Sequence, residues 1–86
     1  MPVIPELSLI PHSAAASVLG IGRTKLYADI SSGLITKPIS NGKNNLWPQH
    51  EIQAVVAYRI DGRSTKEIKA LVNQLMEQRS VIADSF

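Results

Sequence analysis

Hydrophobic residues recur at helical spacing in two short segments near the start of the chain. The first, residues 12–19, is rich in alanine, a strong helix former, and Gly20 suits the position just past a helix end. The second covers residues 23–32, where Leu26 and Ile30 lie one turn apart and are expected to face inward. The pattern therefore predicts two short helices joined by a tight turn.

The segments on either side of these two helices follow different patterns. Residues 1–11 contain three prolines, which lack a backbone donor and resist helix formation, so we expect an extended arm. Residues 34–47 carry apolar side chains on both sides of a polar stretch with Asn41-Gly42, the strongest short signal for a β-hairpin with a type I′ turn. Pro38 restricts the first strand to a sheet edge or a very short ladder.

Helical spacing returns in the second half of the chain. Pro48 opens a third helix, because proline is favoured at a first helical position. The apolar stripe of this helix consists of Ile52, Val55, Val56 and Ile60. A last helix begins at the capping-box residues Ser64 and Glu67 and ends near Arg79, which leaves residues 80–86 as a tail. Its apolar positions are Ile68, Leu71, Val72, Leu75 and Met76.

The order of these elements predicts a mainly α-helical fold with a small β-hairpin. A helix, a glycine-containing turn, a short helix and a hairpin together describe a winged helix-turn-helix. We therefore expect an extended arm at residues 1–11, a winged helix-turn-helix domain at 12–62, an additional C-terminal helix at 63–79 and a tail at 80–86. The C-terminal helix either packs on the domain or mediates self-association, since a continuous apolar stripe suits both.

Length and composition narrow the class of protein. A chain of 86 residues is long enough for one small domain and too short for two, and its 44% hydrophobic content is typical of a folded protein. The absence of cysteine excludes disulfides and thiolate metal sites. No signal peptide and no run of eighteen apolar residues occurs, so we expect a cytoplasmic protein without a membrane partner.

Charge is unevenly distributed along the chain. The formal net charge is only +2, but residues 20–46 carry an excess of three positive charges, with Asp29 as their single acidic residue. The basic residues of this stretch are Arg23, Lys25, Lys37 and Lys43. A local basic excess favours a polyanionic partner such as nucleic acid, although an ordinary solvated surface has the same composition.

The sequence contains no complete motif for a catalytic, cofactor or metal site. Gly20 and Gly22 begin like a dinucleotide-binding fingerprint, but Lys25 replaces the third glycine and the preceding segment is helical. The HEIQA segment at His50 lacks the second histidine of a zinc-binding helix, so we expect His50 and His12 to be surface or capping residues. The carboxylates are scattered over predicted helix surfaces and termini and form no acid–base pair. Asp29 is expected on a helix surface, and Glu51 is expected in the first turn of its helix, where the helix dipole favours it. We therefore expect no enzyme, cofactor or metal site.

The outward face of the second predicted helix is the sharpest candidate for a binding surface. Its residues are Thr24, Lys25, Ala28 and Ser31, with Arg23 and Tyr27 on the flanks. A narrow, small, polar and basic helix face can enter a DNA major groove and donate to phosphates and base edges. Asn41, Lys43 and Asn44 at the hairpin tip suit contacts with phosphates or a minor groove. A solvated helix and an ordinary turn explain these residues too, but the order of elements favours DNA binding.

Two segments carry a resemblance to a known family. AAASVLGIGRTKLYADISSGLITKPI, followed by a short hairpin and LWPQHEIQAVVAYRI, resembles the AlpA-like small regulators of prophages and integrative elements. More distantly, it is similar to the MerR-type winged-helix superfamily and to phage excisionases. The resemblance covers roughly Leu9 to Ile60, with Gly22 where a serine or threonine cap is usual and Asp29 near a position that is often basic.

This resemblance implies sequence-specific binding of double-stranded DNA, by a transcriptional regulator or by an excisionase that bends attachment-site DNA. It places Arg23, Thr24, Lys25 and Tyr27 in the recognition helix and Asn41, Lys43 and Asn44 in the wing. The expected partners are double-stranded DNA and, in addition, a second copy of the chain or an integrase. The alternative is a protein-interaction module that binds a recombinase or a regulatory protein through its C-terminal helix.

Overall fold

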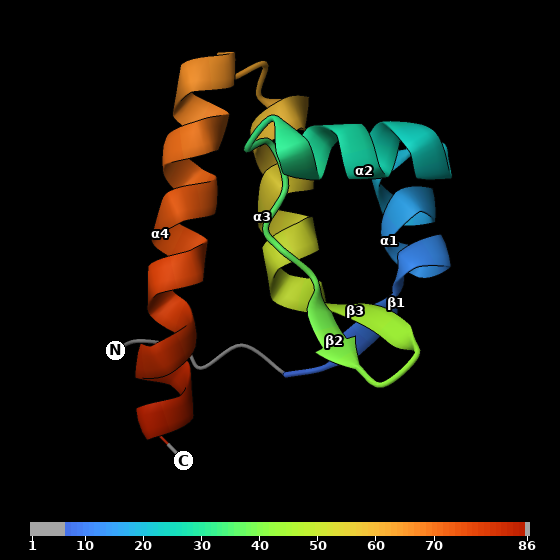
Figure 1. The fold of residues 1–86 in the computed structure, drawn as a ribbon. Helices are drawn as coiled ribbons and strands as arrows, with labels where there is room; N and C mark the ends of the chain where they lie inside the picture. The colour runs from blue at the N-terminus through green and yellow to red at the C-terminus, as the bar shows by residue number, and fades with distance from the viewer. Residues whose placement is uncertain (1–6, 86) are drawn as a thin grey trace.

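The computed structural model describes residues 7–85, so residues 1–6 of the predicted arm and Phe86 of the predicted tail lie outside the described residues. Within this range the chain forms four helices and a three-stranded antiparallel sheet, which confirms a mainly helical fold with a small hairpin (Figure 1). The elements are β1 (Leu9–Pro11), α1 (His12–Leu19), α2 (Arg23–Ser31), β2 (Ile39–Asn41), β3 (Asn44–Pro48), α3 (Gln49–Ile60) and α4 (Thr65–Asp84).

The sheet is built around β3, which pairs with β1 on one side and with β2 on the other. In this register Ile10 lies opposite Trp47, and Ile39 lies opposite Leu46. The last residues of the predicted arm therefore form a third strand of the hairpin sheet. β1 leads directly into α1, so no loop separates the sheet from the first helix.

The hairpin turn differs from the predicted one. Asn41 pairs with Asn44 in the ladder, so Gly42 and Lys43 are the two central residues. Only Gly42 has a positive φ, of 69°, and a positive φ at the first central position alone is typical of a type II′ turn rather than type I′. The turn centre is therefore one residue later than expected, which places Lys43 at the tip.

Helix α4 is longer than predicted. It starts at the expected capping box, in which the Glu67 amide donates to Ser64 Oγ and the Ser64 amide donates to the Glu67 carboxylate. It then continues past Arg79 to Asp84, so most of the predicted tail at 80–86 is helical. No helix within residues 7–85 is both long and apolar enough to cross a membrane.

One core joins all four helices and the sheet. The buried apolar residues are Ala15, Ala16, Leu26, Ile35, Trp47, Ile52, Val55, Ile68, Leu71, Val72 and Leu75. The small side chains of Ala15 and Ala16 allow α1 to lie close to α3, with which it makes extensive contact. Ile60, predicted on the inward stripe, is instead 82% exposed, because the last residue of α3 extends beyond the part that its neighbours cover.

Trp47 is the largest fully buried side chain. Its ring lies between the sheet and the helices, and its indole Nε1 donates to the carbonyl oxygen of Thr36 at 2.9 Å. This bond anchors the segment between α2 and β2, which has no regular secondary structure of its own. A buried indole N–H needs such a partner, so the bond fixes the path of the chain into the hairpin.

Glu51 and Arg79 form an ion pair that joins α3 to α4. The carboxylate of Glu51 is 0% exposed and accepts from Arg79 Nε at 2.8 Å and from Nη2 at 2.7 Å, while Nη2 also donates to the Lys37 carbonyl oxygen at 2.8 Å. Glu51 lies in the first turn of α3, as the sequence predicts, but its main partner is Arg79 rather than the helix dipole.

His50 is not the surface or capping residue that the sequence predicts. Its ring is half-buried, and both ring nitrogens are buried without a hydrogen-bond partner among residues 7–85. The reason is its position beside Glu51 in the first turn of α3, where the sheet and the end of α4 meet.

We expect Arg79→Leu to lower the free energy of unfolding by about 3 kcal/mol, because it leaves the Glu51 carboxylate buried without its partner. The double variant Glu51→Leu/Arg79→Leu is expected to recover most of this loss, since it removes both charges. Urea denaturation measures all three proteins, with Lys66→Ala on the same helix as an exposed control that changes stability by less than about 0.5 kcal/mol. An Arg79→Leu variant as stable as the control would contradict the role of this pair.

Candidate nucleic-acid interface

The turn between α1 and α2 sets the direction of the second helix. Gly20 ends α1 with a φ of 70°, and its amide donates to the last turn of α1. Gly22 then adopts an extended conformation and acts as the N-cap of α2. Leu26 is fully buried beneath α2, so the opposite face of this short helix is directed outward.

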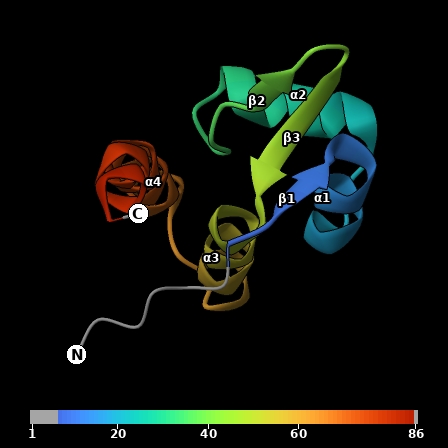
Figure 2. The same ribbon diagram turned by 90° about the horizontal axis from the view of Figure 1, so that it is seen from below.

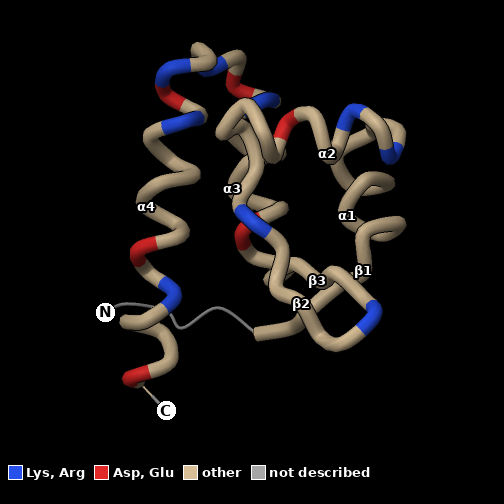
Figure 3. Tube along the Cα trace, in the orientation of Figure 1, with Lys and Arg blue, Asp and Glu red and all other residues tan. Residues whose placement is uncertain are grey.

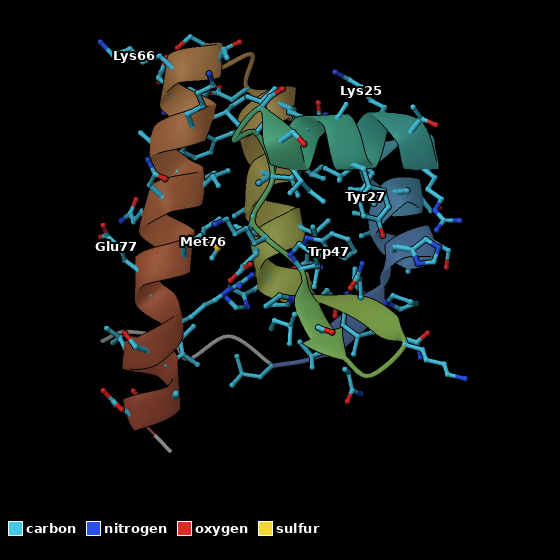
Figure 4. The ribbon with its side chains drawn as sticks, in the orientation of Figure 1. Lys25, Tyr27, Trp47, Lys66, Met76 and Glu77 are labelled. Carbon is cyan, nitrogen blue, oxygen red and sulfur yellow. The ribbon has the colours of Figure 1, made fainter. Side chains whose placement is uncertain are left out.

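The predicted outward residues of α2 are all on the surface. Arg23, Thr24, Lys25, Ala28 and Ser31 are exposed. Figure 4 shows Lys25 pointing away from the body of the protein and Tyr27 pointing inward, toward Trp47. The Ser31 hydroxyl donates to the Tyr27 carbonyl oxygen at 3.3 Å, within its own helix. The face is therefore polar and accessible, and it is basic at its N-terminal half.

Tyr27 connects α2 to the hairpin. Its half-buried ring meets Trp47 edge to face, with 6.4 Å between the ring centroids. Its hydroxyl accepts a hydrogen bond from Asn45 Nδ2 of β3 at 3.2 Å. The guanidinium of Arg23 lies 5.9 Å from the same ring. One tyrosine thus contacts both the sheet and the first residue of α2.

Asp29 is buried, not on the helix surface where the sequence places it. It is 1% exposed and accepts from Lys25 at 2.9 Å and from Arg59 of α3 at 3.0 Å. Burial alone raises the pKa of Asp29, but the hydrogen bonds and charges of Lys25 and Arg59 outweigh it and hold the pKa below its ordinary value. Its charge is therefore directed into the protein, where it fixes α2 on α3.

The hairpin tip and the start of α2 both lie on the side of the molecule away from α4 (Figures 1 and 2). Asn41, Lys43 and Asn44 are exposed at the tip. Figure 3 shows basic positions at the start of α2 and at the tip of the hairpin, with an acidic position toward the end of α2. Within residues 7–85, neither Arg23 nor Lys43 has a carboxylate at ion-pair distance, whereas Lys25, 61% exposed, shares its charge with Asp29.

Sequence reasoning missed two residues of this site. Asn45 alternates along β3 with the exposed Asn44 and shares a face with Trp47, so the two-residue period of a strand could have placed it toward the helices. No sequence pattern predicts the role of Arg59, because its partner Asp29 is thirty positions earlier in the chain. Only the packing of α2 on α3 brings the two side chains together.

Comparisons of the chain with models of protein families, with curated proteins and with solved structures find no match. Within the part of the chain that the structure describes, no three potential metal-ligating side chains lie together.

We expect Asp29→Asn to lower the free energy of unfolding at neutral pH by about 1–3 kcal/mol, because the lost charge weakens both hydrogen bonds. A carboxyl group whose folded pKa is depressed stabilises the protein above its unfolded pKa, and this contribution is lost as the pH falls through the folded value. The variant should therefore lose less stability than the parent protein on acidification below the ordinary range of an aspartate.

Urea denaturation at a series of acidic pH values measures this difference. Asp61→Asn, which removes an exposed carboxylate, serves as the control and should leave the acid dependence nearly unchanged. Identical pH profiles for Asp29→Asn and the parent protein would show that Asp29 does not stabilise the fold through its charge.

Proposed function

We propose that this protein binds double-stranded DNA in a sequence-specific manner as a winged helix-turn-helix, with α2 as the recognition helix and the β2–β3 hairpin as the wing. The observation that carries the proposal is the position of the start of α2 and of the hairpin tip, which both lie on the side of the molecule away from α4 (Figures 1 and 2). Each presents an exposed basic side chain, Arg23 and Lys43, without an ion-pair partner within residues 7–85.

The dimensions of α2 suit a groove. A nine-residue helix is about 14 Å long, and a major groove about 12 Å wide admits an α-helix. The small side chains of Ala28 and Ser31 allow the backbone of α2 to approach base edges closely, and an alanine methyl can contact the methyl group of thymine. The acidic Asp29 offers no repulsion at this surface, because it is buried and paired.

Each exposed residue has a role in this proposal. Thr24 and Lys25 contact base edges from the first turns of α2, and Arg23 and Lys43 bind phosphates on either side of the groove. Asn41 and Asn44 contact the backbone beside Lys43. We assign no catalytic, cofactor or metal role to any residue.

The resemblance to AlpA-like regulators and excisionases supports DNA binding through the same surface. It is compatible with two biological roles. A transcriptional regulator binds near promoters, whereas an excisionase binds at attachment sites and bends them. The position of the selected DNA sites in a source genome separates these two roles.

A protein-interaction role for α4 is less well supported. The apolar stripe that would form such a surface is buried against the chain's own core. Its residues are Ile68, Leu71, Val72 and Leu75. A partner could reach these side chains only if α4 separated from α3, which would also break the ion pair between Glu51 and Arg79.

We expect Arg23→Ala/Lys43→Ala to abolish the enrichment of specific fragments when the purified protein selects DNA from a source genome at moderate salt. The salt dependence of binding to a selected duplex should also become shallower by almost two, because each neutralised phosphate contributes about −0.9 to the slope of log K against log salt.

The matched control is Lys66→Ala/Lys69→Ala, which removes the same charge from exposed positions of α4. Figure 4 shows Lys66 at the far end of the molecule from the hairpin. The control should retain enrichment of the same fragments. If both double variants lost enrichment equally, the loss would follow from the change in net charge alone. That result would contradict the proposed surface.

Tyr27 is expected to act by positioning α2 relative to the hairpin. We expect Tyr27→Phe and Asn45→Ala each to weaken binding of a selected duplex about three- to tenfold, and the double variant to be no weaker than the worse single variant. Fluorescence anisotropy measures the affinities. Additive losses would instead mean that the Tyr27 hydroxyl contacts DNA independently of Asn45.

A further inference from the structure

Lys25 differs from the other basic residues of the proposed surface because its side chain is held in one direction. Its Nζ lies 2.9 Å from Asp29 Oδ1, one turn further along α2. The other carboxylate oxygen of Asp29 accepts from Arg59 Nη2 at 3.0 Å, so α3 holds the carboxylate in place. A free lysine loses about 2 kcal/mol of rotamer entropy when a ligand orders it, whereas folding has already ordered Lys25.

Intrinsic helix stability does not account for an acidic residue at this position. The helix dipole disfavours a carboxylate near the end of a helix, and Asp29 is the third residue from the end of α2. An i, i+4 ion pair in which the base comes first is the weaker of the two orientations. Burial of the carboxylate adds a cost of desolvation. The clearest effect of the network is therefore to fix the direction of Lys25.

The ammonium group of Lys25 keeps two donors for a ligand. It carries three N–H groups, and Asp29 accepts from one of them. The Lys25 side chain is 61% exposed and points away from the body of the protein (Figure 4), so a ligand can reach the other two. Because Asp29 offsets part of its charge, Lys25 attracts a phosphate less strongly than Arg23 or Lys43 does. An uncharged base edge, which requires direction more than charge, is its better complement.

Guanine is the base whose major-groove edge fits two donors. Its N7 and O6 are both acceptors. Adenine presents one acceptor beside an amino donor, thymine presents one acceptor beside a methyl group, and cytosine presents an amino donor. An exposed carboxylate accepts from the cytosine amino group, but the burial of Asp29 prevents this contact.

We propose that Lys25 recognises a guanine by donating to its N7 and O6, and that Asp29 is the positioning residue that directs the ammonium group toward this base. Arg59 acts one step further away, because it holds Asp29. This inference rests on the proposed function, since it assigns one base of the DNA site to one side chain of α2. Asp29 itself does not touch DNA.

7-Deazaguanine tests the contact, because it replaces the N7 acceptor by a C–H group and leaves base pairing intact. Each guanine of a selected duplex is replaced in turn, and fluorescence anisotropy measures the affinity. One replacement should weaken binding of the parent protein about tenfold, since it leaves a charged donor without its acceptor. The same replacement should change the affinity of Lys25→Met less than about twofold, because this variant has already lost the contact.

Asp29→Asn tests the positioning role. It should reduce the effect of that replacement to about threefold, since a neutral amide holds the ammonium group less strongly than a carboxylate does. A partly unfolded variant loses affinity for both duplexes by the same factor, so the ratio of the two affinities reports positioning and not stability. Arg23→Met removes a phosphate contact and should lower both affinities without changing their ratio. The control Lys66→Met, at an exposed position of α4, should change neither.

The possible failures are distinguishable. A selected duplex in which no guanine depends on Lys25 would overturn this inference while the proposed function stands. A ratio in Asp29→Asn as large as that of the parent protein would overturn the positioning role of Asp29. If the protein selects no duplex at all, the proposed function fails and this inference fails with it.

Discussion

The buried ring of Trp47, on the central strand, holds the sheet and the helices of this small structure together. β3 is the only strand with two neighbours among the described residues, so it joins the start of the chain to the hairpin. The Trp47 indole lies in the centre of the core and packs against the ring of Tyr27. Its hydrogen bond to the Thr36 carbonyl oxygen anchors the segment that connects α2 to β2. In a chain of this length one large, fully buried ring supplies an unusual share of the apolar contact that stabilises the fold.

Two buried carboxylates complete this arrangement. Asp29 fixes α2 on α3 through Arg59, and Glu51 fixes α4 on α3 through Arg79. Each of these carboxylates lies in a helix and pairs with an arginine that is far away in the sequence. Ion pairs of this kind specify orientation more than they add stability, because desolvation offsets much of their attraction. The helices and the hairpin therefore form a single body, in which the exposed face of α2 and the hairpin tip keep a fixed relative position.

The sequence predicts most of the helices and the hairpin because their signals are local. Gly20 ends α1, the capping box at Ser64 starts α4, and Pro38 shortens the strand that follows it. The exposed face of α2 also follows from helical periodicity, since Leu26 and Ile30, one turn apart, define the inward direction. The unpredicted features depend on distant contacts or on exact register: the third strand β1, the one-residue shift of the turn, the burial of Asp29 and Glu51, and the half-buried ring of His50.

In the proposed function, the N-terminal half of α2 and the tip of the hairpin together form one DNA-binding surface. Backbone amide shifts of isotopically labelled protein, titrated with a duplex selected from its source genome, locate the binding surface residue by residue. We expect the shifts to be concentrated at residues 23–28 and 41–45, while residues of α4 remain unchanged. Shifts concentrated along α4, or spread evenly over the chain, would contradict it.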